Sequence, residues 1–144
     1  MANTVTAANS VLLLGVSSLF PVPQQIQGFA TDEAFAFPEI KPGEVLTGVD
    51  GNLSVGWVYV PVMQTITLQA DSLSNLFFEQ WYAAEENIQE KLIAFGTIHM
   101  PAVQRSYVLT KGVLTSYTPT AENKKLLQPR KYEITWQSSV AAPI

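Results

Sequence analysis

Residues 62–87 read VMQTITLQADSLSNLFFEQWYAAEEN, and the spacing of their apolar residues changes partway along. From Val62 to Ala70 apolar residues alternate with neutral polar ones, interrupted only by Gln64, which is typical of a half-buried antiparallel strand. From Leu73 onward apolar residues recur every three or four positions, which predicts an amphipathic helix over about residues 73–88. The predicted packing face of this helix consists of Leu73, Leu76, Phe77, Trp81 and Ala84.

The start of the helix and its solvent-facing side are also marked by residue type. Asp71, Ser72 and Ser74 are all residue types that accept hydrogen bonds from the free N–H groups of a helix start. The acidic residues of the segment fall on the opposite side from the apolar stripe, and we expect that side to face solvent: Glu79, Glu85, Glu86 and Glu90.

Most of the remaining chain has the character of strands and loops. Strands are predicted over residues 10–20, ended by Pro21 and Pro23, and over residues 24–30, 62–70, 91–100, 104–118 and 131–139, with Gly112 as a possible bend. Together they predict a mainly β fold of about seven or eight strands, a β-sandwich or partly closed barrel with the helix packed on its side. The 144 residues fit one domain, 1–144.

Two segments do not fit a compact sheet. Residues 1–9 are small and polar and are expected to form a loose arm or an edge strand. Residues 31–56 form a long excursion in which Asp50-Gly51 marks a turn and residues 44–49 are a candidate short strand. Excursions of this length are uncommon inside compact domains and are usually functional, so we expect this one to contact a partner.

The composition suggests a surface that copies of the chain cover. Charged residues make up 14% of the chain, against about 25% in an ordinary soluble domain. Residues 1–90 hold ten acidic residues and one lysine, whereas residues 91–144 hold seven basic residues and two acidic ones. The two halves therefore attract each other, either inside one fold or between neighbours packed head to tail.

The sequence offers little for catalysis or for metal binding. His99 is the only histidine and there is no cysteine, so the usual catalytic triads and zinc sites lack their residues. Asp50-Gly51-Asn52 resembles only a fragment of a calcium loop and fits a turn better. The apolar stretch 11–20 is shorter than a membrane span of about 20 residues and is interpreted as a strand. We therefore predict no enzyme activity, no cofactor, no metal and no membrane insertion.

Two motifs give the chain a likeness to a known family. In TGVDGNLSVG (47–56) and TITLQADSLSNLFFEQW (65–81), a Gly-x-Asp-Gly turn is followed by a Thr-rich strand, an Asp-Ser-x-Ser-Asn helix start and the only long helix. Over about residues 24–90 this arrangement resembles the tail tube proteins of tailed bacteriophages. The same fold serves the tubes of contractile injection machines and of type VI secretion.

The resemblance implies a structural protein of a phage tail. Such proteins assemble into hexameric rings that stack into the hollow tail tube, through which the double-stranded DNA genome passes without specific binding. Implied partners are copies of the chain itself, the tape measure protein, the tail terminator, baseplate or tail tip proteins, and a sheath protein if the tail is contractile. The implied location is the tail of the virion, assembled in the host cytoplasm.

In the resembled family the long loop reaches the adjacent ring. Residues 31–56 would be that inter-ring loop here, and its candidate contact residues are Asp32, Glu33, Phe35, Phe37, Glu39, Lys41, Glu44 and Asp50.

The lumen of a DNA conduit should not bind the phosphates of DNA, because several Lys or Arg contacts would create a salt-dependent affinity for DNA. Strand faces rich in Gln and Thr are hydrated but do not bind phosphates, so they are candidates for the lumen surface. The alternative is that they face the outer solvent. The candidate residues are Gln25, Gln27, Thr65, Thr67 and Gln69.

A second class of function remains open at this stage. The chain could be a small monomeric β-barrel that binds a small ligand or glycan, with Trp57, Tyr59, Trp81 and Trp136 lining its pocket. A stable monomer in solution would distinguish this class from a self-assembling one.

Overall fold

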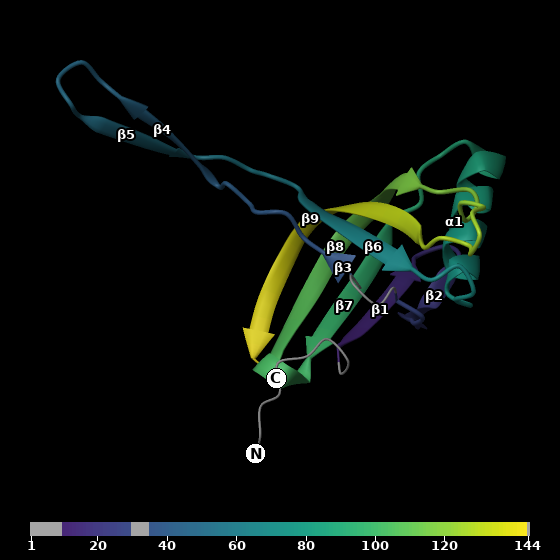
Figure 1. Ribbon diagram of the computed structural model, residues 1–144. Helices are drawn as coiled ribbons and strands as arrows, with labels where there is room; N and C mark the ends of the chain where they lie inside the picture. The colour runs from purple at the N-terminus through teal and green to yellow at the C-terminus, as the bar shows by residue number, and fades with distance from the viewer. Residues whose placement is uncertain (1–9, 30–34, 144) are drawn as a thin grey trace.

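A computed structural model describes residues 10–29 and 35–143, so the predicted arm 1–9 and the loop candidates Asp32 and Glu33 lie outside the described residues. One curled antiparallel sheet dominates the molecule (Figure 1). Its seven strands lie in the order β2-β1-β7-β8-β9-β6-β3. They are β1 (Val11–Val16), β2 (Phe20–Ile26), β3 (Phe35–Ala36), β6 (Val62–Leu68), β7 (Ala94–Met100), β8 (Arg105–Tyr117) and β9 (Arg130–Pro143). The mainly β, partly closed barrel is confirmed, with one large sheet in place of two stacked ones.

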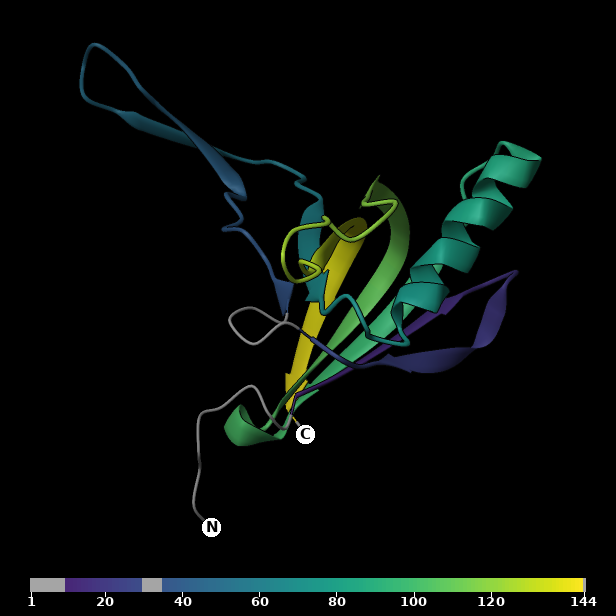
Figure 2. The same ribbon diagram turned by 45° about the vertical axis from the view of Figure 1, so that its right-hand side comes forward.

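The helix α1 (Asn75–Ile88) covers one face of this sheet, as Figure 2 shows, and leaves the opposite face bare of helices among the described residues. Phe78 stacks on Tyr132 of β9 with ring centroids 4.1 Å apart, and Phe77 stacks on Phe20 of β2 at 4.7 Å. The helix therefore bridges strands from the two halves of the sheet. A 3₁₀ turn, η2 (Pro101–Val103), joins β7 to β8.

The core lies between α1 and the concave side of the sheet. Alternate residues of each strand supply it, as the period of two in β6 and β9 predicts. Its fully buried members include Leu12, Leu14, Ile66, Leu68, Phe78, Trp81, Ile98, Leu109, Tyr132, Ile134 and Trp136. Gln64, which interrupts the apolar face of β6 in the sequence, is fully buried and accepts a hydrogen bond from Trp136 Nε1 to its Oε1 at 3.0 Å. Gln64 thus supplies the acceptor for the buried indole N–H of Trp136.

The first two strands differ from their predicted bounds. β1 ends at Val16, and Pro21 and Pro23 lie inside β2 instead of stopping the strand before it. Proline is tolerated there because β2 is the outermost strand of the sheet, where a missing N–H breaks no ladder on the solvent side. Around the prolines the register shifts, so that Leu14 pairs with Gln24 but Val16 pairs with Phe20.

The long excursion folds into a separate two-stranded hairpin, β4 (Gly43–Thr47) and β5 (Leu53–Trp57). Neither strand pairs with the main sheet, and Figures 1 and 2 show the hairpin projecting away from the body of the molecule. At its tip Gly51 has a φ of +84°, and the N–H of Gly48 donates to the carbonyl of Asn52 at 2.9 Å. The turn predicted at Asp50-Gly51 is therefore present. The candidate strand at residues 44–49 overlaps β4, whereas β5 was not predicted.

Gly112 lies under the ring of Trp136 and leaves no room for a side chain. A Cβ built on Gly112 would lie 2.5 Å from Cε3 of Trp136, inside the packed core. We expect Gly112→Ala to destabilise the fold by about 1–3 kcal/mol, because the indole has to shift. Thermal unfolding followed by circular dichroism measures the effect, which for a domain of this size is roughly 2–4 °C per kcal/mol.

The matched control is Gly56→Ala in β5, where an added Cβ meets nothing within 4 Å. We expect its melting temperature to stay close to that of the parent chain, as surface substitutions usually change stability by less than about 0.5 kcal/mol. Equal melting temperatures for the Gly112→Ala and Gly56→Ala variants would contradict the tight packing at Trp136.

Candidate assembly surfaces

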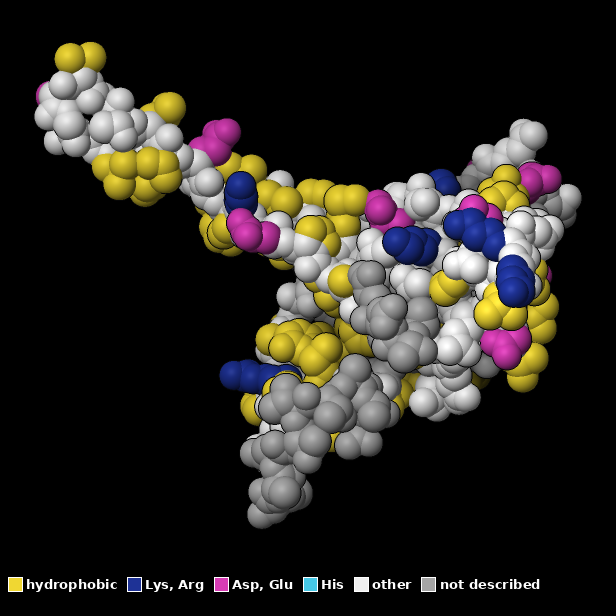
Figure 3. Space-filling view, in the orientation of Figure 1, with side chains coloured by type: hydrophobic (Ala, Val, Ile, Leu, Met, Phe, Trp, Pro, Cys, Tyr) yellow, Lys and Arg dark blue, Asp and Glu magenta, His cyan; other side chains and the backbone are white. Residues whose placement is uncertain are grey.

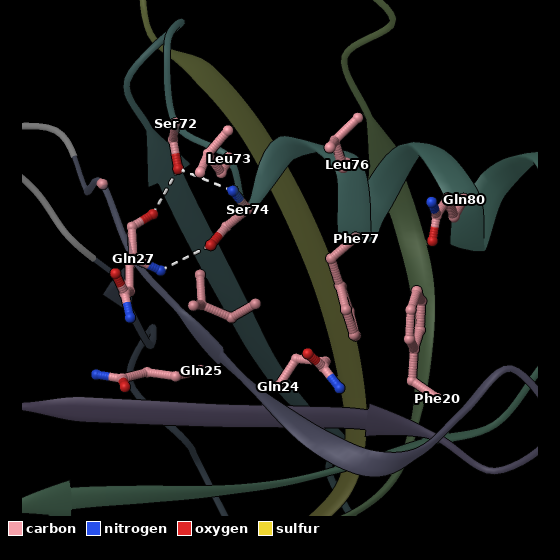
Figure 4. A pocket seen from close by; sticks show the side chains of 12 residues that line it. Phe20, Gln24, Gln25, Gln27, Ser72, Leu73, Ser74, Leu76, Phe77 and Gln80 are labelled. Carbon is pink, nitrogen blue, oxygen red and sulfur yellow. Dashed lines mark hydrogen bonds between the residues drawn. The ribbon is translucent and has the colours of Figure 1, made fainter.

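The loop before α1 ties the helix to two distant parts of the sheet. Ser72 Oγ donates to the carbonyl of Gln27, and the N–H of Gln27 donates to Ser74 Oγ at 2.8 Å, as the dashed lines in Figure 4 show. The two serines therefore satisfy both backbone groups of Gln27, at the end of β2, much as a neighbouring strand would. Ser74 is the N-cap residue of α1 but makes no side-chain cap bond, and Ser72 Oγ accepts from the N–H of Ser74 at 3.2 Å.

Asn75 is the centre of this junction and is only 5% exposed. Its Nδ2 donates to the carbonyls of Gln69 and Ser72, both at 3.0 Å, and its Oδ1 accepts from the hydroxyl of Tyr132 at 2.8 Å. Burial raises the pKa of Tyr132, so the phenol stays protonated and remains a donor. The Asp-Ser-x-Ser-Asn segment thus positions α1 on β2, β6 and β9 at once.

Part of the predicted packing face of the helix is wrong. Phe77 and Trp81 are buried, but Leu73 is 84% exposed and Leu76 is 54% exposed, because Leu73 precedes the helix and the Asn75 contacts turn Leu76 outward. Ala84 is partly buried. Phe78 and Asn75 occupy the packing face in place of the two leucines.

Glu85 is also wrong as a solvent-facing residue, since it is buried. Its carboxylate accepts from the N–H of Leu92 at 2.9 Å and from Lys91 Nζ at 3.2 Å, and so holds the turn after the helix. Arg130 Nη1 is paired with Glu79 at 2.7 Å. In both ion pairs the acid comes from residues 1–90 and the base from residues 91–144, so part of the charge asymmetry is neutralised inside the subunit.

The sheet face opposite α1 is not covered by a helix, and on β6 and β9 its two charges are of opposite sign. On β6 and the paired half of β9 its members are Met63, Thr65, Lys131, Glu133 and Thr135, which alternate with buried residues, whereas Thr67 in the same row is itself buried. Thr115 of β8 adds a hydroxyl, 3.2 Å from that of Thr135. Further along the sheet, the register aligns Gln25, Leu13, Thr97, Val108 and Val140 in one row.

The five lumen candidates do not form one surface. Thr65 lies on the open face, and Gln25 shares the register row described above. Thr67 is only 4% exposed, so it offers nothing to a lumen. Gln27 is held by Ser72 and Ser74 beyond the end of β2, and Gln69 follows the end of β6. Thr97, Thr115 and Thr135 are further open-face residues that the sequence did not single out. Thr97 and Thr115 lie in strands without the clean alternation of β6, whereas Thr135 lies in the alternating part of β9.

The two margins of the sheet are unlike each other. At one margin β2 carries Pro21 and Pro23, and its last backbone groups are taken by the serines described above. At the other margin the pairing of β6 with β9 ends at Val62 and Trp136, whereas β9 continues to Pro143. Residues Gln137–Pro143, which we call the β9 overhang, pair only with β8 among the described strands (Figure 1).

The projecting hairpin exposes an unusual amount of apolar surface, which Figure 3 shows along its length. Its strongly exposed apolar residues are Val45, Leu46, Val49, Leu53, Val55, Trp57 and Tyr59. The rings of Trp57 and Tyr59 meet edge to face at 6.1 Å. Exposed apolar patches of this kind mark interaction sites in soluble proteins.

The predicted loop residues separate into two groups. Phe35 pairs with Ile66 as part of β3 and packs against Phe29 and Phe37, so it anchors the excursion to the main sheet. Glu39 and Lys41 lie on the exposed connection to the hairpin, Glu44 lies in β4, and Asp50 lies at the tip. At the tip, Asp50 accepts from the N–H and from the side-chain amide of Asn52.

A groove runs between β2 and the start of α1 (Figure 4). Phe20 and Phe77 form its floor, and neutral polar side chains such as Gln24 and Gln80 line its rim. The four aromatic residues of the alternative binding module do not line this groove. Trp57 and Tyr59 belong to the projecting hairpin and its base, whereas Trp81 and Trp136 are fully buried in the core.

Within the described part of the chain, no group of three or more His, Cys, Asp or Glu side chains could hold a metal ion. No described helix is both long and apolar enough to cross a membrane.

Three solved structures have a fold similar to that of this chain. A chain from the six-fold symmetrised anti-feeding prophage baseplate is similar over 99% of this chain and 98% of its own, with 9% identity and a TM-score of 0.61. A chain from the sheath/tube terminator of an extracellular contractile injection system, PVC, is similar over 99% of both chains, with 12% identity and a TM-score of 0.64. A chain from the anti-feeding prophage tube-terminating cap is similar over 100% of this chain and 94% of its own, with 12% identity and a TM-score of 0.61.

At these identities the structural likeness shows the fold alone. None of the curated proteins matches the chain in sequence. The family model described as tail fiber protein gp32 matches residues 3–140, nearly the whole chain. The chain therefore belongs to the tail fiber protein gp32 family, a phage tail-related family.

Proposed function

We propose that this protein is a non-enzymatic structural subunit of the phage tail that assembles into hexameric rings, and that these rings stack into the tail tube. The observation that carries the proposal is the contrast between the two faces of the sheet. One face is sealed by α1, while the other is threonine-rich, and on β6 and β9 it carries one lysine against one glutamate, so it has no net positive charge with which to bind the phosphates of DNA. The similar folds in a baseplate, a tube terminator and a cap support a place along the tube axis.

The hairpin supports the assembly part of the proposal. It exposes Val45, Leu46, Val55 and Trp57 to water although a two-stranded hairpin is at best marginally stable alone. A neighbouring subunit that covered these side chains would stabilise the hairpin and join the two subunits. We propose that this contact links successive rings.

A terminal ring is the second candidate, because the similar structures come from a terminator, a cap and a baseplate. A tube subunit offers the same contacts above and below itself, so it grows without limit. A terminator or cap offers one of the two contacts, so it stops at a single ring. The partners proposed for either role are further copies of the chain and the other tail proteins: tape measure, terminator, baseplate or tail tip, and sheath if the tail contracts.

Negative-stain electron microscopy of the purified full chain tests the proposal. We expect hollow particles with six-fold rings, and long tubes at high protein concentration. Rings that never stack would favour the terminal role. A monodisperse species of 15.8 kDa at high concentration would overturn assembly altogether.

A further inference from the structure

The sheet is protected at one margin and unprotected at the other. An exposed strand edge is a template for pairing with another chain, and proteins commonly block such edges with proline or charge. β2 holds Pro21 and Pro23, which have no N–H to offer, and the backbone of Gln27 is already bonded to Ser72 and Ser74. Little of this margin remains for a neighbouring strand.

The β9 overhang has none of these protections. Its sequence, QSSVAAP, contains no charged residue and no proline before Pro143. Most of its side chains are exposed, including Val140 at 56%. Its inner edge is paired to β8 as far as Arg105 and Pro143, which holds the outer edge in the extended form that another strand requires.

Among the described residues, no strand other than β8 pairs with the β9 overhang. β5 ends at Trp57 and β6 begins at Val62, and the last residue between them is Pro61. At that point the chain departs from β9, and Figures 1 and 2 show the hairpin directed away from the sheet. The hairpin of the same subunit therefore does not cover the overhang.

We propose that the β4–β5 hairpin of a second copy adds as a strand to the β9 overhang, which extends the main sheet across the subunit boundary. This inference rests on the proposed assembly and names the surface that receives the hairpin. The five residues of either hairpin strand fit along the seven of the overhang. Both partners are uncharged over most of their length, and each needs what the other supplies: the hairpin needs apolar cover, and the overhang needs hydrogen-bonding partners.

The charges at the ends of the contact agree with this arrangement. The hairpin carries Glu44 and Asp50, and Arg105 lies beside Pro143 at the far end of the overhang. Hairpin and overhang are different surfaces of the same chain, so the contact is heterologous. Contacts of this kind repeat from subunit to subunit and produce rings or filaments.

Cross-linking between two singly substituted chains tests the proposal, since the natural chain has no cysteine. One preparation carries Val45→Cys or Val55→Cys in the hairpin, and the other carries Val140→Cys in the overhang. The control for the second preparation is Val22→Cys, a valine that is 69% exposed, against 56% for Val140, and lies on the opposite margin of the same sheet, beside Pro21 and Pro23. The preparations are mixed, assembled, treated with a short bismaleimide and separated on a denaturing gel.

We expect a mixed dimer between a hairpin variant and the Val140→Cys variant, in about tenfold or greater excess over the Val22→Cys control, because adjacent strands hold the two thiols at high effective concentration. Assembled particles with no such excess, or with cross-links to Val22→Cys, would overturn the docking site while leaving the proposed assembly intact. Absence of any particle would overturn the proposed function and this inference together.

Discussion

Replacing residues 42–58 with a short Gly-Ser linker is expected to leave a folded chain that no longer forms tubes. The hairpin pairs only with itself, so its removal takes no hydrogen-bonded partner from the seven-stranded sheet. We expect the melting temperature to change by less than about 5 °C, since shortening a surface connection alters loop entropy only slightly. The loss of Trp57 and of the apolar strands removes the residues most able to act as binding hot spots, which is a large effect on association. Circular dichroism and negative-stain microscopy measure the two outcomes.

Adding the shortened chain to the natural one provides the control for misfolding. A correctly folded variant still presents the β9 overhang, so it should bind the hairpin of a natural subunit and then offer no hairpin of its own. We expect tubes to become shorter as its share of the mixture rises. A shortened chain that forms tubes of normal length by itself would remove the hairpin from the proposed mechanism.

The local pattern of the sequence was enough to locate the elements that have one buried face. The apolar residues are spaced by two in β6 and by three or four in α1, which follows it. Both elements begin and end within two residues of the predicted bounds. This works because burial of one face imposes the period on the sequence directly. β9 was found for the same reason, through Tyr132, Ile134 and Trp136.

The prediction failed where position in the sheet decides what a residue tolerates. Pro21 and Pro23 would end a central strand, but β2 is an edge strand, and strand order is not visible in local sequence. β4 and β5 are exposed on both faces, so no burial period marks them. Only a candidate short strand over residues 44–49, which overlaps β4, and the turn at Asp50-Gly51 were predicted there.

The rotation of the helix was also beyond the sequence pattern. Leu73 and Leu76 fit the apolar stripe as well as Phe77 and Trp81 do, yet both are exposed. We attribute the choice of the buried side to the polar contact of Asn75 with Tyr132, two residues 57 positions apart. A buried polar contact between distant elements leaves no trace in the period of either one.

Asn75→Ala is accordingly expected to be among the most destabilising single substitutions in the chain. It removes the side-chain bonds to the carbonyls of Gln69 and Ser72 and leaves the hydroxyl of Tyr132 without its acceptor. Losing several bonds at a buried site, with the former partners left unsatisfied, costs about 3–5 kcal/mol. For a domain of this size we expect a fall in melting temperature of roughly 10 °C. Thermal and urea unfolding of the monomer measure the change.

Tyr132→Phe separates the contribution of the sheet from that of the loop. It removes only the hydroxyl and keeps the stacked ring on Phe78, so we expect a smaller loss, about 1–2 kcal/mol. The double variant should lose less stability than the sum of the losses of the two single variants, because both single changes break the same bond between Asn75 and Tyr132. Fully additive losses would mean that this bond does not couple α1 to β9, and the helix would then be positioned by its apolar contacts with Phe20 and Tyr132 alone.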